Sequence, residues 1–159
     1  MNRLLKFWSL TRREKEFFCE ASILLSVSNA SVKAIPFRHI DRFLRARWSY
    51  GIQGDIDHER KIRLVNHSIS RAANALPWKS LCLSRSIAQF IMLRRRGIPA
   101  ILFLGVKFSG HSSLEAHAWV DTGPGGNDKN FDRCGYAIVT RIGTGAVDLG
   151  TGPRRVVVR

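Results

Sequence analysis

The stretch Pro77-Trp78-Lys79-Ser80-Leu81-Cys82-Leu83-Ser84-Arg85-Ser86 joins two segments of helical period. Pro77 and Trp78 end an apolar period that runs over residues 57 to 76, and Ser80 is placed to cap the helix that follows. Cys82 would then lie near the second residue of the new helix. Helix N-termini expose unpaired N–H groups and a positive partial charge, which favour a thiolate. We therefore predict a nucleophilic thiol at Cys82, with an inert buried cysteine as the alternative.

The residues after Cys82 first complete a helix and then change period. Gly97 closes the helix, and Pro99 prevents its continuation. Residues 100 to 108 form a nearly continuous apolar run, which predicts a central strand buried on both faces. Residues 114 to 121 alternate instead, which predicts a second strand. One face of that strand carries His117, Trp119 and Asp121.

His117 is the candidate base for the thiol. It follows Cys82 by thirty-five positions. A histidine within hydrogen-bond reach can take the proton of a thiol and later pass it to a leaving group. A third polar residue should orient that histidine. A structural role for His117 is the alternative, and His111, in a Gly/Ser turn, is the weaker substitute as base.

The ordered set of motifs resembles the papain-like and transglutaminase-like superfamily. It is most similar to the leader peptidases of lasso-peptide biosynthesis, the transglutaminase-like B proteins. The similarity rests on Cys82-Leu83-Ser84-Arg85-Ser86, Leu93-Arg94-Arg95-Arg96-Gly97-Ile98-Pro99-Ala100, Leu104-Gly105-Val106 and Ala116-His117-Ala118-Trp119-Val120. It also takes in Glu20-Ala21 and Ile35-Pro36-Phe37-Arg38, and spans residues 10 to 141.

The resemblance implies an α+β fold, in which N-terminal helices precede a transglutaminase-like (papain-like) core with the nucleophile helix packed on a small antiparallel sheet. It also implies a Cys-His-Asp triad. Asp128, eleven residues after His117, lies where the family carries its histidine-orienting aspartate. Asp132 is the runner-up, because a register slip or a longer turn would bring it into place. Asp121 ranks last, because two pleats separate it from His117.

By the same resemblance, the chain is a cysteine peptidase that removes the leader of a lasso precursor peptide, so that a partner lasso cyclase can close the ring. No leader-binding winged-helix pattern is evident, so we expect a separate small leader-recognition protein as a partner. Trp78 and Ser80 are candidate oxyanion-site neighbours. No cofactor is expected. Two alternatives are acyl transfer of the transglutaminase type on the same triad and a basic, non-catalytic binding or scaffold protein.

The length of 159 residues and the 45% hydrophobic content predict one domain with one core. We place it at residues 1–141, with a helical part at 1–48, a catalytic core at 57–141 and a flexible basic tail at 142–159. Thr11 and Glu14 predict a capping box for a helix over residues 12 to 34. Pro36 ends that helix and starts another, whose apolar stripe includes Ile40 and Leu44.

Lys and Arg outnumber Asp and Glu by 26 to 12, a formal charge of +14. The basic residues are spread along the chain without an aromatic-rich basic strand, which disfavours nucleic acid as the partner. Cys19, Cys82 and Cys134 form neither a disulfide framework nor a zinc-ligand spacing, and we expect Cys19 to be a small buried helix residue. For the same reason of spacing, we expect no bound metal. The sequence shows no secretory signal and no apolar run long enough to span a membrane, so we expect a cytoplasmic protein.

Overall fold

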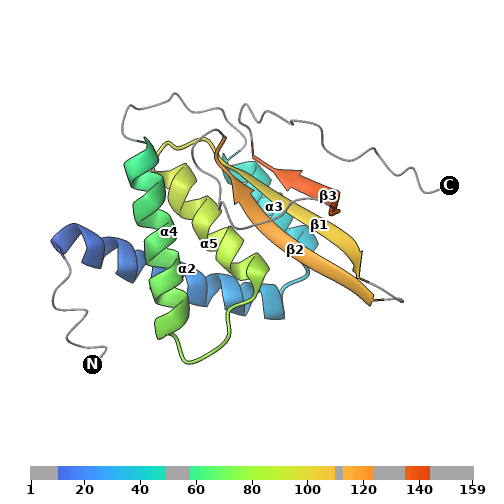
Figure 1. The fold of residues 1–159 in the computed structure, drawn as a ribbon, viewed down its shortest axis with the longest axis horizontal. Helices are drawn as coiled ribbons and strands as arrows, with labels where there is room; N and C mark the ends of the chain where they lie inside the picture. The colour runs from blue at the N-terminus through green and yellow to red at the C-terminus, as the bar shows by residue number, and fades with distance from the viewer. Residues whose placement is uncertain (1–10, 49–57, 110–112, 124–134, 144–159) are drawn as a thin grey trace.

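The computed structural model describes residues 11–48, 58–109, 113–123 and 135–143. Over these residues it contains four helices and a three-stranded antiparallel sheet (Figure 1). The elements are α2 (Arg12–Ala34), α3 (Phe37–Trp48), α4 (His58–Ala75), α5 (Cys82–Arg95), β1 (Ile101–Ser109), β2 (Ser113–Asp121) and β3 (Ala137–Ile142). The predicted α+β class is confirmed.

α2 begins at the capping box that the sequence predicts. The Thr11 hydroxyl accepts a hydrogen bond from the Glu14 N–H at 3.3 Å, and the Glu14 carboxylate accepts one from the Thr11 N–H at 3.0 Å. The Thr11 N–H and hydroxyl both donate to the Glu14 carboxylate, and these two bonds lower the pKa of Glu14. Phe17 and Ala21 belong to the apolar stripe of α2 and are buried, but Cys19 is exposed. The prediction of a buried Cys19 is wrong, because two positions along a helix turn a side chain about 200° from the stripe.

The sheet has the strand order β2-β1-β3, which places the continuous apolar strand β1 in the centre, as predicted. Leu102 of β1 pairs with Val120 on one side and with Ile142 on the other. Ile142 is fully buried at the end of β3. The basic tail therefore does not begin at residue 142 as predicted, and the predicted tail from 144 onward lies outside the described residues.

Gly143 allows β3 to end against the core. Its φ is +107°, and an added Cβ would lie 2.5 Å from the carbonyl oxygen of Ala100 and 3.0 Å from the Phe90 ring. A glycine is required there, because other residues rarely adopt that φ and the backbone leaves no space for a side chain.

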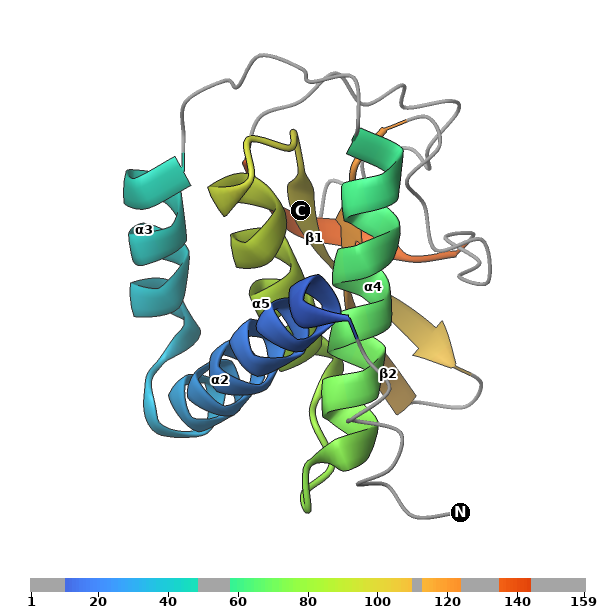
Figure 2. The same ribbon diagram turned by 90° about the vertical axis from the view of Figure 1, so that its left-hand side faces the viewer.

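α5 is the central helix of the fold. Figure 2 shows α3 on one side of α5, α4 on the other, α2 crossing in front and the sheet behind. Phe90, Met92 and Leu93 of α5 are fully buried in the core. This position gives α5 two lateral faces, one toward α4 and one toward α3.

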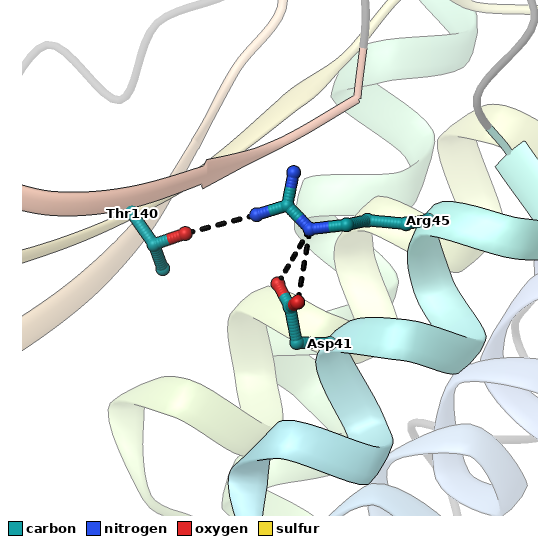
Figure 3. A network of polar contacts seen from close by, with 3 residues as sticks. All are labelled: Asp41, Arg45 and Thr140. Carbon is teal, nitrogen blue, oxygen red and sulfur yellow. Dashed lines mark hydrogen bonds and ion pairs between the residues drawn. The ribbon is translucent and has the colours of Figure 1, made fainter.

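A polar contact joins α3 to the outer strand β3 (Figure 3). The Arg45 Nε donates to both carboxylate oxygens of Asp41 at 2.9 Å, and its Nη2 donates to the Thr140 hydroxyl at 3.0 Å. The one carboxylate of α3 is therefore held on the side of the helix that faces β3. Among the described helices, none is long and apolar enough to cross a membrane.

Candidate active site

Cys82 is the first residue of α5, one position closer to the N-terminus of the helix than the sequence predicts. The N-cap is Leu81, which makes no side-chain capping hydrogen bond. Ser80 is not the cap, because its hydroxyl instead accepts a hydrogen bond from the Arg85 Nε at 2.6 Å. The Ser84 hydroxyl donates back to the Leu81 carbonyl at 2.8 Å. The first-turn N–H groups of α5 thus have no side-chain cap beside the Cys82 thiol.

A cleft of about 530 Å³ lies between α4, α5 and β2. It is lined by both Cys82 and His117, each half-buried, although the two residues are far apart in the sequence. Ser80 also lines the cleft, whereas Trp78 is 39% exposed and is not among its lining residues. The remaining lining residues are Asn66, Ile69, Ser70, Arg85, Ser86, Gln89, Ala118, Trp119 and Val120.

Two hydrogen bonds fix the walls of this cleft. The buried Ser86 hydroxyl donates to the Ala118 carbonyl at 2.8 Å, which ties α5 to β2 beside His117. The Gln89 side-chain amide donates to the Asn66 side-chain oxygen at 2.7 Å, which ties α5 to α4. Sequence reasoning missed these residues. A signal was present, because Ser86 and Gln89 lie four and seven positions after Cys82 and so share its helical face.

His117 lies in an aromatic cluster on β2. Its ring stacks on Trp119 with centroids 6.3 Å apart, and the Tyr136 ring is 5.9 Å away. Gly105 of β1, which pairs with His117 of β2, leaves room for these rings, since a Cβ there would lie 3.0 Å from the Trp119 ring. Burial lowers the pKa of His117, and the charge of Glu115 opposes that shift. The imidazole is therefore neutral near pH 7 and able to accept a proton.

Glu115 is a carboxylate next to this cluster that sequence reasoning did not identify. The Tyr136 hydroxyl donates to Glu115 Oε1 at 2.8 Å. This bond, together with burial and the charges of Glu115 and Cys82, raises the pKa of Tyr136, so the phenol keeps its proton. Glu115 precedes His117 by two residues on a strand, so the alternation itself places both on one face.

Of the remaining candidates for the triad, the structure describes Asp121 alone. Asp128 and Asp132, and the alternative base His111, lie outside the described residues. Asp121 is buried at the far end of β2, where its carboxylate accepts the Gly123 N–H at 2.9 Å. Within the described part of the chain, no group of three or more His, Cys, Asp or Glu side chains is placed to hold a metal ion.

Fold and cleft together define an α+β protein that sets a helix-start cysteine and a strand histidine in one cavity. The family model of the transglutaminase-like superfamily matches residues 26–137, from the middle of α2 to the start of β3. The chain belongs to that superfamily, whose members are typically cysteine-based enzymes. This confirms the resemblance at the level of the superfamily. Neither a curated protein nor a solved structure matches the chain.

Proposed function

We propose that the protein is a cysteine peptidase with Cys82 as nucleophile and His117 as its general base and acid. The observation that supports this proposal most directly is that both side chains line the same cleft. Membership of the transglutaminase-like superfamily supports cysteine-based acyl chemistry in general. The finer assignment, to peptide hydrolysis, comes from the resemblance of the motifs to lasso leader peptidases.

In the proposed reaction, His117 accepts the thiol proton, and the Cys82 sulfur attacks the scissile carbonyl carbon. The peptide C–N bond breaks to leave a thioester on Cys82, and His117 returns the proton to the departing amine. Water then attacks the thioester with His117 as base, which releases the acid product and the free thiol. The first-turn N–H groups of α5, beside Ser80, are suitable donors to the oxyanion because no side chain caps them.

The proposed orienting residue for His117 is Asp128, with Asp132 as the second choice. Both assignments rest on the family resemblance. Glu115 is a second source of negative charge near His117, because its charge opposes the lowering of the His117 pKa by burial.

The proposed substrate is the leader segment of a ribosomally made lasso precursor peptide. A separate small leader-recognition protein would deliver the leader, and a lasso cyclase would use the new N-terminus, all in the cytoplasm. A formal charge of +14 suits an acidic leader or an acidic partner, so raising the salt concentration should weaken that association.

The first test is thiol alkylation at about pH 6, where an unperturbed thiol of pKa about 8.5 is under roughly 1% ionised. Cys19 is a matched internal control, because it is exposed whereas Cys82 is only half-buried in its cleft. Accessibility alone therefore predicts faster labelling of Cys19. We expect peptide mapping to show faster labelling of Cys82, and we expect His117→Ala to remove that preference. Equal or slower labelling of Cys82 would contradict an activated thiol.

Product masses separate hydrolysis from acyl transfer. The precursor peptide is incubated with the enzyme and the leader-recognition protein, with and without an added primary amine. Hydrolysis adds one water across the cleaved bond and leaves the masses unchanged by the amine. An amine adduct on the leader fragment would instead indicate transferase chemistry, and leader binding that survives Cys82→Ala without any turnover in the wild type would indicate a scaffold.

A further inference from the structure

A second cavity, of about 400 Å³, lies on the opposite flank of α5 from Cys82, between α2, α3 and α5. We call it the apolar groove. Its floor includes Leu44 and Ile87, both almost fully buried. Its rim includes Val27, Ile35 and Phe43, which are 57%, 44% and 59% exposed. The other lining residues are Ser28, Ser31, His39, Ile40 and Ile91.

The apolar exposure extends beyond the cavity. Ile23, one helical turn before Val27 on α2, is 64% exposed. Large apolar side chains that gather around a concave surface mark a site for an apolar ligand or partner, whereas scattered ones do not. The groove is concave and runs along two helices, which suits a row of side chains from a polypeptide segment.

The charges around the groove are almost all positive. Arg38 and Arg42 are exposed on α3, directly before the groove residues His39 and Phe43, and the Arg38 Nε donates to the His39 ring at 3.2 Å. No acidic side chain lines the groove in the part of the chain that the structure describes. From Ala21 to the end of α2, and throughout α3 and α5, Asp41 is the only carboxylate. Arg45 holds that carboxylate on the β3 side of α3 (Figure 3).

We infer that the apolar groove binds an amphipathic, acidic polypeptide segment of another protein. Apolar side chains of that segment would fill the cavity, and its carboxylates would meet Arg38 and Arg42. Charge decides against two other occupants. A second copy of this chain would bring a formal charge of +14 to a basic rim, and residues 1–10 carry Arg3 and Lys6 without an acidic residue. Both would be repelled rather than attracted.

The groove also lies apart from the cleft lined by Cys82 and His117, which we call the thiol cleft. Ile87 and Ile91 line the groove, whereas Cys82, Ser86 and Gln89 line the cleft. These two sets project from opposite sides of α5, because a helix turns 100° per residue. A segment bound in the groove would leave the cleft open. The inference does not depend on the proposed peptidase activity, and binding can be measured without turnover.

The test uses the full chain, immobilised, and a phage-displayed random peptide library of about 16 residues, long enough to span the groove as a helix. Enriched peptides are synthesised, and their affinity is measured by fluorescence anisotropy. We expect an excess of Asp and Glu, with apolar residues three and four positions apart. We also expect Phe43→Ser to weaken binding about tenfold.

Matched variants distinguish binding in the groove from nonspecific hydrophobic binding elsewhere on the protein. Phe108→Ser makes the same substitution at a 77% exposed phenylalanine on β1 and should leave the affinity unchanged. Arg38→Gln with Arg42→Gln should weaken acidic peptides, whereas Arg60→Gln with Arg63→Gln on α4 should not. Absence of enrichment, enrichment without an acidic bias, or insensitivity to Phe43→Ser would overturn the inference. Phe43-dependent binding to phosphatidylserine vesicles alone, or a Phe43-dependent dimer, would also overturn it.

Discussion

The thiol cleft and the apolar groove share one wall, α5, yet the side chains that line them differ in polarity. Seven of the residues around the thiol cleft are polar or charged besides Cys82: Asn66, Ser70, Ser80, Arg85, Ser86, Gln89 and His117. The groove is lined mainly by aliphatic and aromatic side chains. The comparison teaches that one helix can present a mainly polar face to one cavity and an apolar face to another.

The division follows from helical geometry. Cys82, Ser86 and Gln89 recur at intervals of three and four and so face α4 and β2, whereas Ile87 and Ile91 face α2 and α3. The proposed reactive face needs polar groups that hold the His117 imidazole and the Cys82 thiol in a fixed relative position. A recognition face needs exposed apolar area and charge. Substitutions in one face should therefore leave the other unchanged.

The largest expected effect is that of removing the nucleophile. We expect Cys82→Ala to lower cleavage of the precursor peptide by about 10⁴-fold or more, because loss of a nucleophile removes the covalent route. Mass spectrometry of timed reactions measures this loss. Peptide affinity for the apolar groove should not change, and Cys19→Ala serves as the control. Substantial turnover by Cys82→Ala would contradict the proposed nucleophile.

A change in the shared wall should disturb both sites. Phe90 is fully buried in α5 and lies against the end of β3 near Gly143. We expect Phe90→Ala to lower the free energy of unfolding by about 3–5 kcal/mol, the usual cost of a large cavity in a core. Denaturant unfolding measures it. Phe108→Ala, at an exposed site, should change it by no more than about 0.5 kcal/mol. A loss below about 1 kcal/mol for Phe90→Ala would show that α5 is not the common support.

A smaller effect should be confined to the thiol cleft. Ser86→Ala removes the hydrogen bond to the Ala118 carbonyl that ties α5 to β2. We expect a loss of about 1 kcal/mol in the free energy of unfolding and a weaker preference for labelling Cys82 over Cys19. Groove affinity should stay the same. Ser70→Ala, at an exposed position of the same cleft, is the control, and an equal effect of both variants would contradict the role of Ser86.

The smallest expected effect is a change in proton affinity. The charge of Glu115 partly offsets the lowering of the His117 pKa by burial, so Glu115→Gln should lower that pKa further. Because His117 acts as a base only when neutral, the acid limb of the cleavage profile should move to lower pH. NMR titration of the imidazole checks the direction. Glu16→Gln is the control, and a raised or unchanged His117 pKa would contradict the coupling to Glu115.

Local sequence signals predicted most of the elements. The capping box at Thr11, the stop at Gly97 and the change after Pro99 from a helical period to a continuous apolar run all have short-range causes. Two of the errors have equally plain reasons. Cys19 was expected to be buried but lies on another face of α2 than the apolar stripe, and the Ser80 hydroxyl accepts a hydrogen bond from Arg85 and does not cap the helix.

The sequence by itself determined the α+β class, the central apolar strand and the candidate pair Cys82 and His117, because each depends on residue type and local period. Only the tertiary structure decided that this pair lines one cleft and that Glu115 and Tyr136 lie beside the histidine. It also decided that an apolar groove with arginines beside it lies on the opposite side of α5. These features join elements far apart in the chain. Their positions follow from the packing of α5 against the sheet and the other helices, which no local pattern specifies.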